Sequence, residues 1–417
     1  MKVFRIKQRR NIVKVKALVV TMVLLLFSSA LLTGCKANPI VSSEWQTIDG
    51  EGGLFAEGGY YYASHSDFLY FLDISNGNDV CLCSKIGCIH DTKPGYPEEH
   101  CEARLAGNLV CYWDSGIYTI DAHNYGCYLY RRNADGTGEQ QVMELCVEYK
   151  EAQKEVANLK TLFADGYIYY VASIQGITEE NGAIVSETES YVLKRIDLHS
   201  KKEEEILSSP KELSISLVAA RGNSVLYTEW YIPDHNRDNY LDAIMNSVEK
   251  LILLDINTGE RKVILEKKYS QGYEIEAVVD NKILYSTLES GTLDDGQWAC
   301  RSLNIDTGED TLLHHMDIDY INEHLGWRLV LDSENELGWA YILVDLKTGK
   351  DLPMEFNGNI SILNMSESIA IVFRSEPKTD GSGSVRILSF CTLDSLMDGL
   401  QMEDLIDFYI RQPGPKS

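Results

Sequence analysis

Short apolar stretches alternate with tight polar turns along most of this chain. In residues 251–265, the clearest case, LILLDI and RKVIL flank Asn257-Thr258-Gly259-Glu260. Glycine adopts the positive φ that a tight hairpin needs, and asparagine tolerates nearby strained positions, so this stretch predicts a β-hairpin. Looser copies occupy residues 70–82, 128–143, 303–313 and 342–352. A degenerate copy at 193–207 has Ser200-Lys201-Lys202 where the glycine would stand.

A second pattern accompanies the hairpins, in which a polar or glycine residue is followed within three positions by an apolar, tyrosine-rich stretch. It begins at Gly58, Gly107, Asp165, Gly222, Asp280, Gly326 and Glu367, in steps of 49, 58, 57, 58, 46 and 41 residues. One strand, a variable connection and a strand–turn–strand make a four-stranded blade, whose usual period is about 40 to 50 residues. The chain is therefore predicted to be all-β, a β-propeller of seven blades, with six or eight as alternatives.

Some segments depart from this repeat. Residues 175–189 and 231–250 are insertions, which we expect in loops at one face of the propeller. Residues 148–162 have a helical composition, and residues 240–250 carry apolar residues at helical spacing. Each of these two segments is either a short helix between strands or a strand.

A ring of blades has to close, because an open edge strand invites aggregation. Residues 45–48, with the sequence WQTI, are predicted to form a strand that completes the last blade beside residues 386–390. Residues 412–417, with the sequence QPGPKS, are predicted to be a disordered tail.

The N-terminus has the pattern of a targeting segment. Residues 1–16 hold seven basic residues and no acid, residues 17–32 are apolar, and Leu32-Thr33-Gly34-Cys35 follows. A basic region, a short apolar region and small residues at a cleavage point are typical of a signal peptide. The alternatives are an ordinary cleaved signal without lipid and an uncleaved anchor helix.

The segment around Cys35 resembles the lipobox of bacterial lipoproteins, which implies a diacylglyceryl Cys35 at the mature N-terminus. Two acyl chains hold a protein stably at a membrane, whereas one does so only marginally. The predicted organisation is a signal peptide at 1–34, lipidated Cys35 and a tether at 35–55, the propeller at 56–411 and the tail at 412–417. The predicted location is the outer face of the cytoplasmic membrane, with the membrane as one partner.

The chain is acidic, with 63 Asp and Glu, 38 Lys and Arg, and a formal net charge of −25. Residues 1–34 carry seven basic residues, so their removal leaves 31 basic residues and a formal charge of −32. Such a surface repels nucleic acid, which is therefore excluded as a predicted partner. The negative charge is expected to keep the protein soluble through self-repulsion. The alternative is that it attracts cationic peptides or divalent ions.

Seven of the ten cysteines lie between residues 81 and 146. Within this group, Cys83, Cys88, His90 and Cys101 offer three thiolates and an imidazole in under twenty residues, the donor set of a tetrahedral zinc site. The spacing differs from common zinc-finger patterns, and thiols outside the membrane can oxidise to disulfides. A structural zinc ion, disulfides and free thiols all remain open, and no other cofactor is predicted.

The run Leu82-Cys83, Lys85, Cys88 and His90, followed by Cys101-Glu102-Ala103, resembles a family of Gram-positive lipoproteins of unknown function. The repeat rhythm extends this resemblance over much of the mature chain. It implies a propeller like those of low-density-lipoprotein-receptor and TolB proteins, and an extracytoplasmic location, without a known activity. The sequence departs from the family at Ile86, where proline is usual, and in a longer insert before Cys101.

Other candidate sites are weaker. Residues 234–239 resemble the start of a calcium loop, but the glycine at position six is missing and Met245 replaces the bidentate glutamate. His314-His315 near Asp317 and Asp319 is a solvated turn or a metal site, and residues 381–384 are a loop tip.

The sequence contains neither a Gly-x-Ser-x-Gly elbow nor a His-Glu-x-x-His pair. The predicted function is a ligand-binding or protein-interaction module without catalysis, with an unknown extracellular ligand or envelope protein as partner. One alternative is an extracellular hydrolase or lyase acting on glycan or peptide, and another is a structural assembly subunit.

Overall fold

The computed structural model describes residues 45–411 apart from gaps at 48–52, 57, 64–67, 87, 89–100, 106, 124–125, 146–147, 151–152, 181–182, 233–239, 292–295, 315–318, 321–324, 332–338, 346–349, 353–359, 367, 378–383 and 399. All of these residues belong to one compact unit, Ser42–Ser417. Among them, no helix is both long and apolar enough to cross a membrane. The predicted signal peptide, Cys35 and the predicted tail lie outside the described residues.

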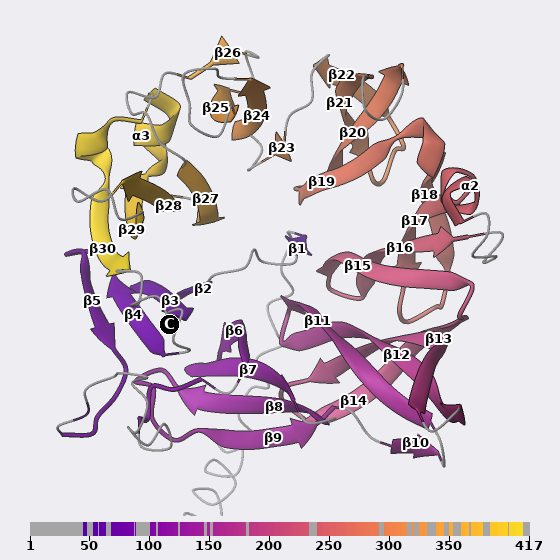
Figure 1. Cartoon of the computed structure of the whole chain (residues 1–417), viewed down its shortest axis with the longest axis horizontal. Coiled ribbons are helices and arrows are strands. Elements are labelled where there is room, and N and C mark those ends of the chain that lie inside the picture. Colours follow the sequence, from indigo (N-terminus) through magenta and orange to yellow (C-terminus); the bar gives the residue numbers. More distant parts are fainter. Residues whose placement is uncertain are drawn as a thin grey trace, which may run out of the picture. The chain divides into compact units, whose positions relative to one another are not determined.

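The described residues form seven antiparallel sheets, in which nearly every strand pairs with its neighbour in sequence (Figure 1). The first sheet consists of β2 (Gly53–Ala56), β3 (Gly59–Ala63), β4 (Leu69–Asp73) and β5 (Asn78–Cys81). The second consists of β6 (Asn108–Trp113), β7 (Gly116–His123), β8 (Gly126–Asn133) and β9 (Gln140–Glu144). The third consists of β10 (Glu148–Lys150), β11 (Gln153–Ala164), β12 (Tyr167–Glu180), β13 (Ala183–Asp197) and β14 (Lys202–Pro210). The fourth is β1 (Gln46–Thr47), β15 (Leu213–Arg221), β16 (Ser224–Tyr231), β17 (Val248–Asp255), β18 (Arg261–Lys268).

The fifth sheet consists of β19 (Tyr273–Val279), β20 (Lys282–Ser290), β21 (Gln297–Asn304) and β22 (Asp310–His314). The sixth consists of β23 (Asp319–Tyr320), β24 (Leu325–Leu331), β25 (Trp339–Asp345) and β26 (Lys350–Asp351). The seventh consists of β27 (Ile360–Met365), β28 (Ile369–Pro377), β29 (Ser384–Thr392) and β30 (Ile406–Arg411). The short helices are α2 (Tyr240–Met245), η3 (Tyr269–Gln271), α3 (Leu393–Asp398) and η4 (Met402–Asp404).

In six of the seven sheets, one central strand is buried over most of its length in the part of the chain whose burial is described, which explains the tyrosine-rich stretches in the sequence. These strands are β3, β7, β12, β16, β20 and β28. In four sheets the fourth residue of that strand is a buried tyrosine: Tyr62, Tyr170, Tyr227 and Tyr285. Burial of a tyrosine hydroxyl requires a partner, and the last strand of the sheet supplies an acid in three cases. Those bonds are Tyr62 to Asp79, Tyr170 to Glu203 and Tyr285 to Asp310, at 2.8, 2.9 and 3.0 Å.

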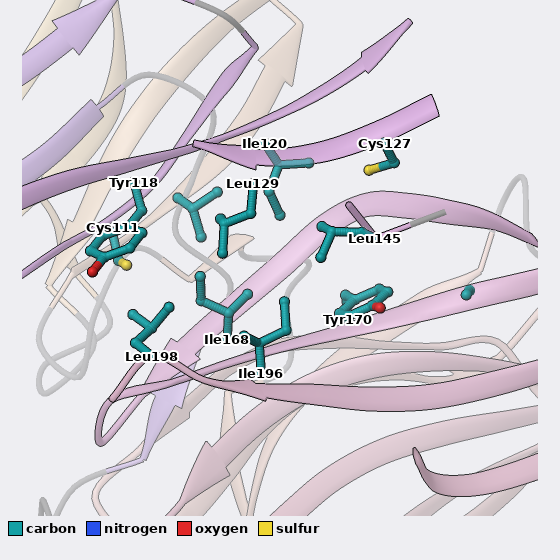
Figure 2. Packing of buried hydrophobic residues seen from close by; sticks show 12 residues of the cluster. Cys111, Tyr118, Ile120, Cys127, Leu129, Leu145, Ile168, Tyr170, Ile196 and Leu198 are labelled. Atoms are coloured by element: carbon teal, nitrogen blue, oxygen red, sulfur yellow. The ribbon is translucent and has the colours of Figure 1, made fainter. Parts of the chain in front are cut away.

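Neighbouring sheets pack face to face through apolar side chains. In the second and third sheets, Ile120 and Leu129 lie in one cluster with Ile168, Tyr170 and Ile196 (Figure 2). Each is at most 3% exposed, and burial of one such side chain contributes roughly 1.5–3 kcal/mol. Alternating apolar residues on strands of this composition therefore hold the sheets to one another.

The last sheet packs against the first, so the sheets close into a β-propeller. Tyr62 of β3 lies in one cluster with Phe390 of β29 and Phe408 of β30, and the Tyr62 and Phe408 ring centroids are 5.3 Å apart. The prediction of an all-β propeller is therefore confirmed. The seven sheets of the described residues fall within the predicted range of six to eight blades.

The predicted closing strand was wrong. Residues 386–390 pair with β30 of their own sheet, whereas β1 pairs with β15 of the fourth sheet, Gln46 opposite Ala220 and Thr47 opposite Ala219. Trp45, only 6% exposed, decides this position because it packs with apolar residues of the fourth and fifth sheets. A short apolar strand fits many sheet edges, and the sequence around it does not specify which one. β1 and the first three residues of β2 lie within residues 35–55, which the sequence assigned to a tether.

The two ambiguous segments resolve in different ways. Residues 148–162 are strands, β10 and most of β11, because β11 pairs along its length with β12. Residues 240–250 are helix α2 followed by the start of β17. In the first case pairing with a buried strand overrides helical propensity.

The connections define two ends of each sheet. The strands of the third and fourth sheets are counted here without β10 and β1, so that each sheet has four. At the turn end, the first strand turns into the second and the third into the fourth. At the loop end, the second strand leads to the third, and the fourth leads to the next sheet. At the turn end, Asp165 accepts a hydrogen bond from the N–H of Gly222 in the next sheet. The two longest connections among residues 53–411, at 82–107 and 232–247, lie at the loop end. Both predicted insertions are also there, the first as a prolonged β12–β13 hairpin.

Candidate metal centre

Three of the four predicted metal-ligating residues converge. Cys83 follows β5, Cys101 precedes β6, and the Sγ atoms of Cys83, Cys88 and Cys101 all lie within 4.8 Å of one another. All three side chains are partly exposed. The fourth predicted ligand, His90, lies outside the described residues.

The backbone of Leu69, the first residue of β4, holds both cysteine segments. Its N–H donates to the carbonyl of Ala103 at 2.7 Å, and its carbonyl accepts from the N–H of Leu82 at 2.9 Å. Phe68 extends this contact by a β-bridge to Arg104. Because Leu69 is fully buried, the two segments are fixed to the core of the first sheet immediately beside the cysteines.

Arg132 of β8 holds the Cys101 segment from the other side. Its guanidinium donates to the carbonyls of Glu102 and Arg104, and it forms an ion pair with Glu139. The side chain is only 3% exposed, and a buried guanidinium is costly unless it is paired and hydrogen-bonded. Arg132 therefore fixes the backbone of Glu102 and Arg104, next to Cys101.

A side-chain contact ties the two cysteine segments to each other. The carboxylate of Glu102, next to Cys101, accepts hydrogen bonds from the hydroxyl and the N–H of Ser84, next to Cys83. With the anchors at Leu69 and Arg132, this contact restrains the relative position of the two thiols.

Hydrogen bonds favour ionisation of Cys83. Partial burial disfavours its charged form, but the N–H groups of Lys85 and Glu102 donate to the sulfur. The neighbouring thiols also donate, and the pKa of Cys83 is held below its ordinary value of 9.0.

The pKa of Cys101 shifts in the opposite direction. Burial is the main cause, and it raises the pKa of the thiol to about 12 even though the N–H of Ala103 donates to the sulfur. The negative Cys83 nearby adds to the increase. Without a cation, Cys83 therefore ionises before Cys101.

A cluster of three thiols has few chemical uses. It can ligate a soft cation, it can form one disulfide and leave a third thiol, or its most acidic member can act as a nucleophile. Residues 234–239, His315, Asp317 and 381–383, the weaker candidates from the sequence, lie outside the described residues.

The sequence identified the three cysteines but missed the residues that position them. Leu69 is an ordinary apolar strand residue, and Arg132 lies 31 positions after Cys101. Their role depends on pairing between distant segments, and no local signal in the sequence indicates it.

The sequence matches no protein-family model and no curated protein. Among solved structures, the chain is similar to oligogalacturonate lyase from Vibrio parahaemolyticus, with 11% identity, a TM-score of 0.46 and coverage of 83% of this chain and 91% of the lyase. It is also similar to TolB from Acinetobacter baumannii, with 12% identity, a TM-score of 0.34 and coverage of 83% and 76%.

A third similarity is to an acylaminoacyl peptidase from Pyrococcus horikoshii, with 11% identity and a TM-score of 0.44. The chain covers only 50% of that peptidase, while 82% of the chain is matched. The likeness is one of fold. At these identities no activity passes from any of these proteins to this chain.

Proposed function

We propose that this chain is a lipid-anchored β-propeller on the outer face of the cytoplasmic membrane, which binds a ligand or protein partner and catalyses no reaction. Cys35 would carry the diacylglyceryl group and begin the mature chain. The basic residues, the apolar run and Leu32-Thr33-Gly34-Cys35 support this anchor. Two acyl chains are sufficient for stable attachment.

The observation that carries the proposal is the direction of β1. It runs antiparallel to β15, with Gln46 opposite Ala220, so Trp45 lies level with Arg221. The guanidinium carbon of Arg221 lies 4.6 Å from the Trp45 ring centroid, and Arg221 is the last residue of β15. The chain therefore enters the fourth sheet from its turn end.

Because the tether is short, this entry point would set the orientation of the propeller relative to the membrane. Cys35 and Trp45 are ten residues apart in sequence, and ten fully extended residues span at most about 36 Å. A lipid on Cys35 would keep the turn end towards the membrane, and the loop end would face away from it. The loop end carries the longest connections, and such segments on a rigid scaffold commonly bind partners.

Attachment is tested by expressing the full chain in a bacterium with a labelled fatty acid. We expect the wild-type protein in the membrane fraction with the label, and Cys35→Ser without the label. Cys81→Ser, which changes another cysteine, serves as control and keeps the label. Label retained in Cys35→Ser would contradict the anchor.

Binding is tested with a photo-cross-linking residue on the intact lipoprotein. Tyr231 and Met245 at the loop end are 43% and 41% exposed, and exposed Thr258 and Thr307 at the turn end serve as controls. We expect a discrete adduct with an envelope component from the loop end, competed by the purified ectodomain. Absence of any adduct, or turnover of glycan or peptide substrates by the ectodomain, would overturn the proposal.

A further inference from the structure

We propose that Cys83, Cys88 and Cys101 bind one Zn²⁺ ion as thiolates, and that this ion joins the end of β5 to the segment before β6. The site supplies three of the four ligands of a tetrahedral centre. This inference is independent of the lipid anchor and of the partner, since it depends only on residues of the first two sheets.

The distances fit a common cation. Zinc binds thiolate sulfur at about 2.3 Å, so two sulfurs of one tetrahedral centre lie about 3.8 Å apart. The three Sγ atoms already lie within 4.8 Å of one another. To bind one ion, each pair of Sγ atoms thus has to come closer by no more than about 1 Å, which rotation of the cysteine side chains can supply.

The surrounding groups resemble those that support metal thiolates. The N–H of Lys85 donates to Cys83 and the N–H of Ala103 donates to Cys101, in each case from two residues further along the chain. The N–H of Glu102 donates to Cys83 as well. Such donors stabilise the negative sulfurs and orient them before the ion arrives.

A cation accounts for the cluster better than a disulfide does. A disulfide joins two sulfurs and leaves the third, whereas a soft ion uses all three. Coordination also protects thiolates in an oxidising compartment, and zinc itself has no redox chemistry. All three cysteines are partly exposed, so the ion can reach them from solvent.

The bound ion would have a structural role. It would link residues 83–88 to residue 101 across residues 89–100, which lie outside the described residues. On binding, the thiols lose their protons to solvent and no electron is transferred. The two segments that Leu69 already joins, at Leu82 and Ala103, would thereby be joined a second time by the metal.

The first experiment measures metal content and free thiols of the ectodomain purified without chelator. We expect about one equivalent of zinc, and three thiols that react with iodoacetamide only after the ion is chelated. Titration with Co²⁺ should give a thiolate-to-cobalt charge-transfer band and the visible bands of tetrahedral coordination.

Variants separate a metal site from a fold defect. Cys88→Ser should weaken Zn²⁺ affinity by more than roughly 100-fold, and Ser84→Ala, which removes the tie to Glu102, by roughly 10-fold. Cys81→Ser is the matched control, because Cys81 lies at the end of β5 outside the cluster and its loss should leave affinity unchanged. Circular dichroism of each variant should keep the β-sheet spectrum.

Three results would overturn the assignment. The first is a metal-free protein that does not bind added Zn²⁺. The second is a mass lower by two hydrogens in peptides containing these cysteines, which means a disulfide. The third is a Cys81→Ser variant that loses zinc as completely as Cys88→Ser does.

Discussion

At the scale of single residues, one turn repeats from sheet to sheet. In the fourth sheet the N–H of Gly259 donates to the carbonyl of Asp255 at 2.8 Å, with Gly259 at φ +71°. Gly77 and Gly308 occupy the equivalent position at φ +73° and +71°. The acid before the turn contributes too, since Asp255 accepts from the N–H of Thr258 and its pKa is lowered by that bond.

The third sheet makes the same turn without glycine. The N–H of Lys201 donates to the carbonyl of Asp197 at 2.8 Å, and Lys201 has φ +54°. A left-handed conformation costs a residue with a Cβ roughly 1–2 kcal/mol, and glycine avoids that cost. Lys201→Gly should therefore raise the free energy of unfolding by about 1 kcal/mol in urea denaturation.

The converse substitution is the control. A Cβ at Gly259 meets no atom within 4 Å, so Gly259→Ala adds only backbone strain and should lower the free energy of unfolding by about 1 kcal/mol. If Lys201→Gly destabilises the protein, the left-handed turn is not the source of strain.

Residues with a local signal were predicted, and residues with a distant partner were not. Gly259 was expected in a hairpin turn, and Lys201 marked the place of a missing glycine. The three cysteines were grouped by their closeness in sequence. The positions of Leu69 and Arg132 depend on which strands meet, and composition near them is uninformative.

At the scale of elements, β1 shows what a hydrophobic pattern can and cannot specify. The pattern of residues 45–48 predicted a strand, and the strand exists. The predicted pairing partner of this strand was wrong, because a two-residue strand carries little pairing information. The buried indole of Trp45 decides the partner through contacts that no periodicity encodes.

This placement predicts that Trp45 stabilises the ring. Replacement of a buried tryptophan by alanine usually costs 3–5 kcal/mol. We expect Trp45→Ala to lower the free energy of unfolding by about 3 kcal/mol, and Trp45→Phe to lower it less. The measurement is urea denaturation of the ectodomain.

A truncation is the control for this prediction. An ectodomain that begins at residue 45 should be as stable as one that begins at residue 36, because it keeps Trp45 and β1. Equal stability of wild type and Trp45→Ala would show that β1 does not dock on β15 in solution.

At the scale of the whole molecule, the repeat rhythm was sufficient to predict an all-β propeller. The same apolar stretch and polar turn recur from unit to unit in the sequence, so an error in one unit does not alter the inference. The way in which the sheets close was not predictable, because it depends on Phe390 and Phe408 meeting Tyr62 across more than three hundred residues.

The central proposal is that the lipid on Cys35 anchors the propeller with its turn end towards the membrane. Fluorescence energy transfer tests it on the lipidated protein in vesicles whose headgroups carry an acceptor dye. A donor amino acid replaces Thr258 at the turn end or Met245 at the loop end of the same sheet. An eight-residue strand such as β17 is roughly 26 Å long, so the two positions differ measurably in distance.

The account predicts stronger transfer from residue 258 than from residue 245. It also predicts that both signals vanish in Cys35→Ser, which lacks the anchor. Equal transfer from the two positions, or stronger transfer from residue 245, would contradict the orientation and with it the proposed display of the loop end.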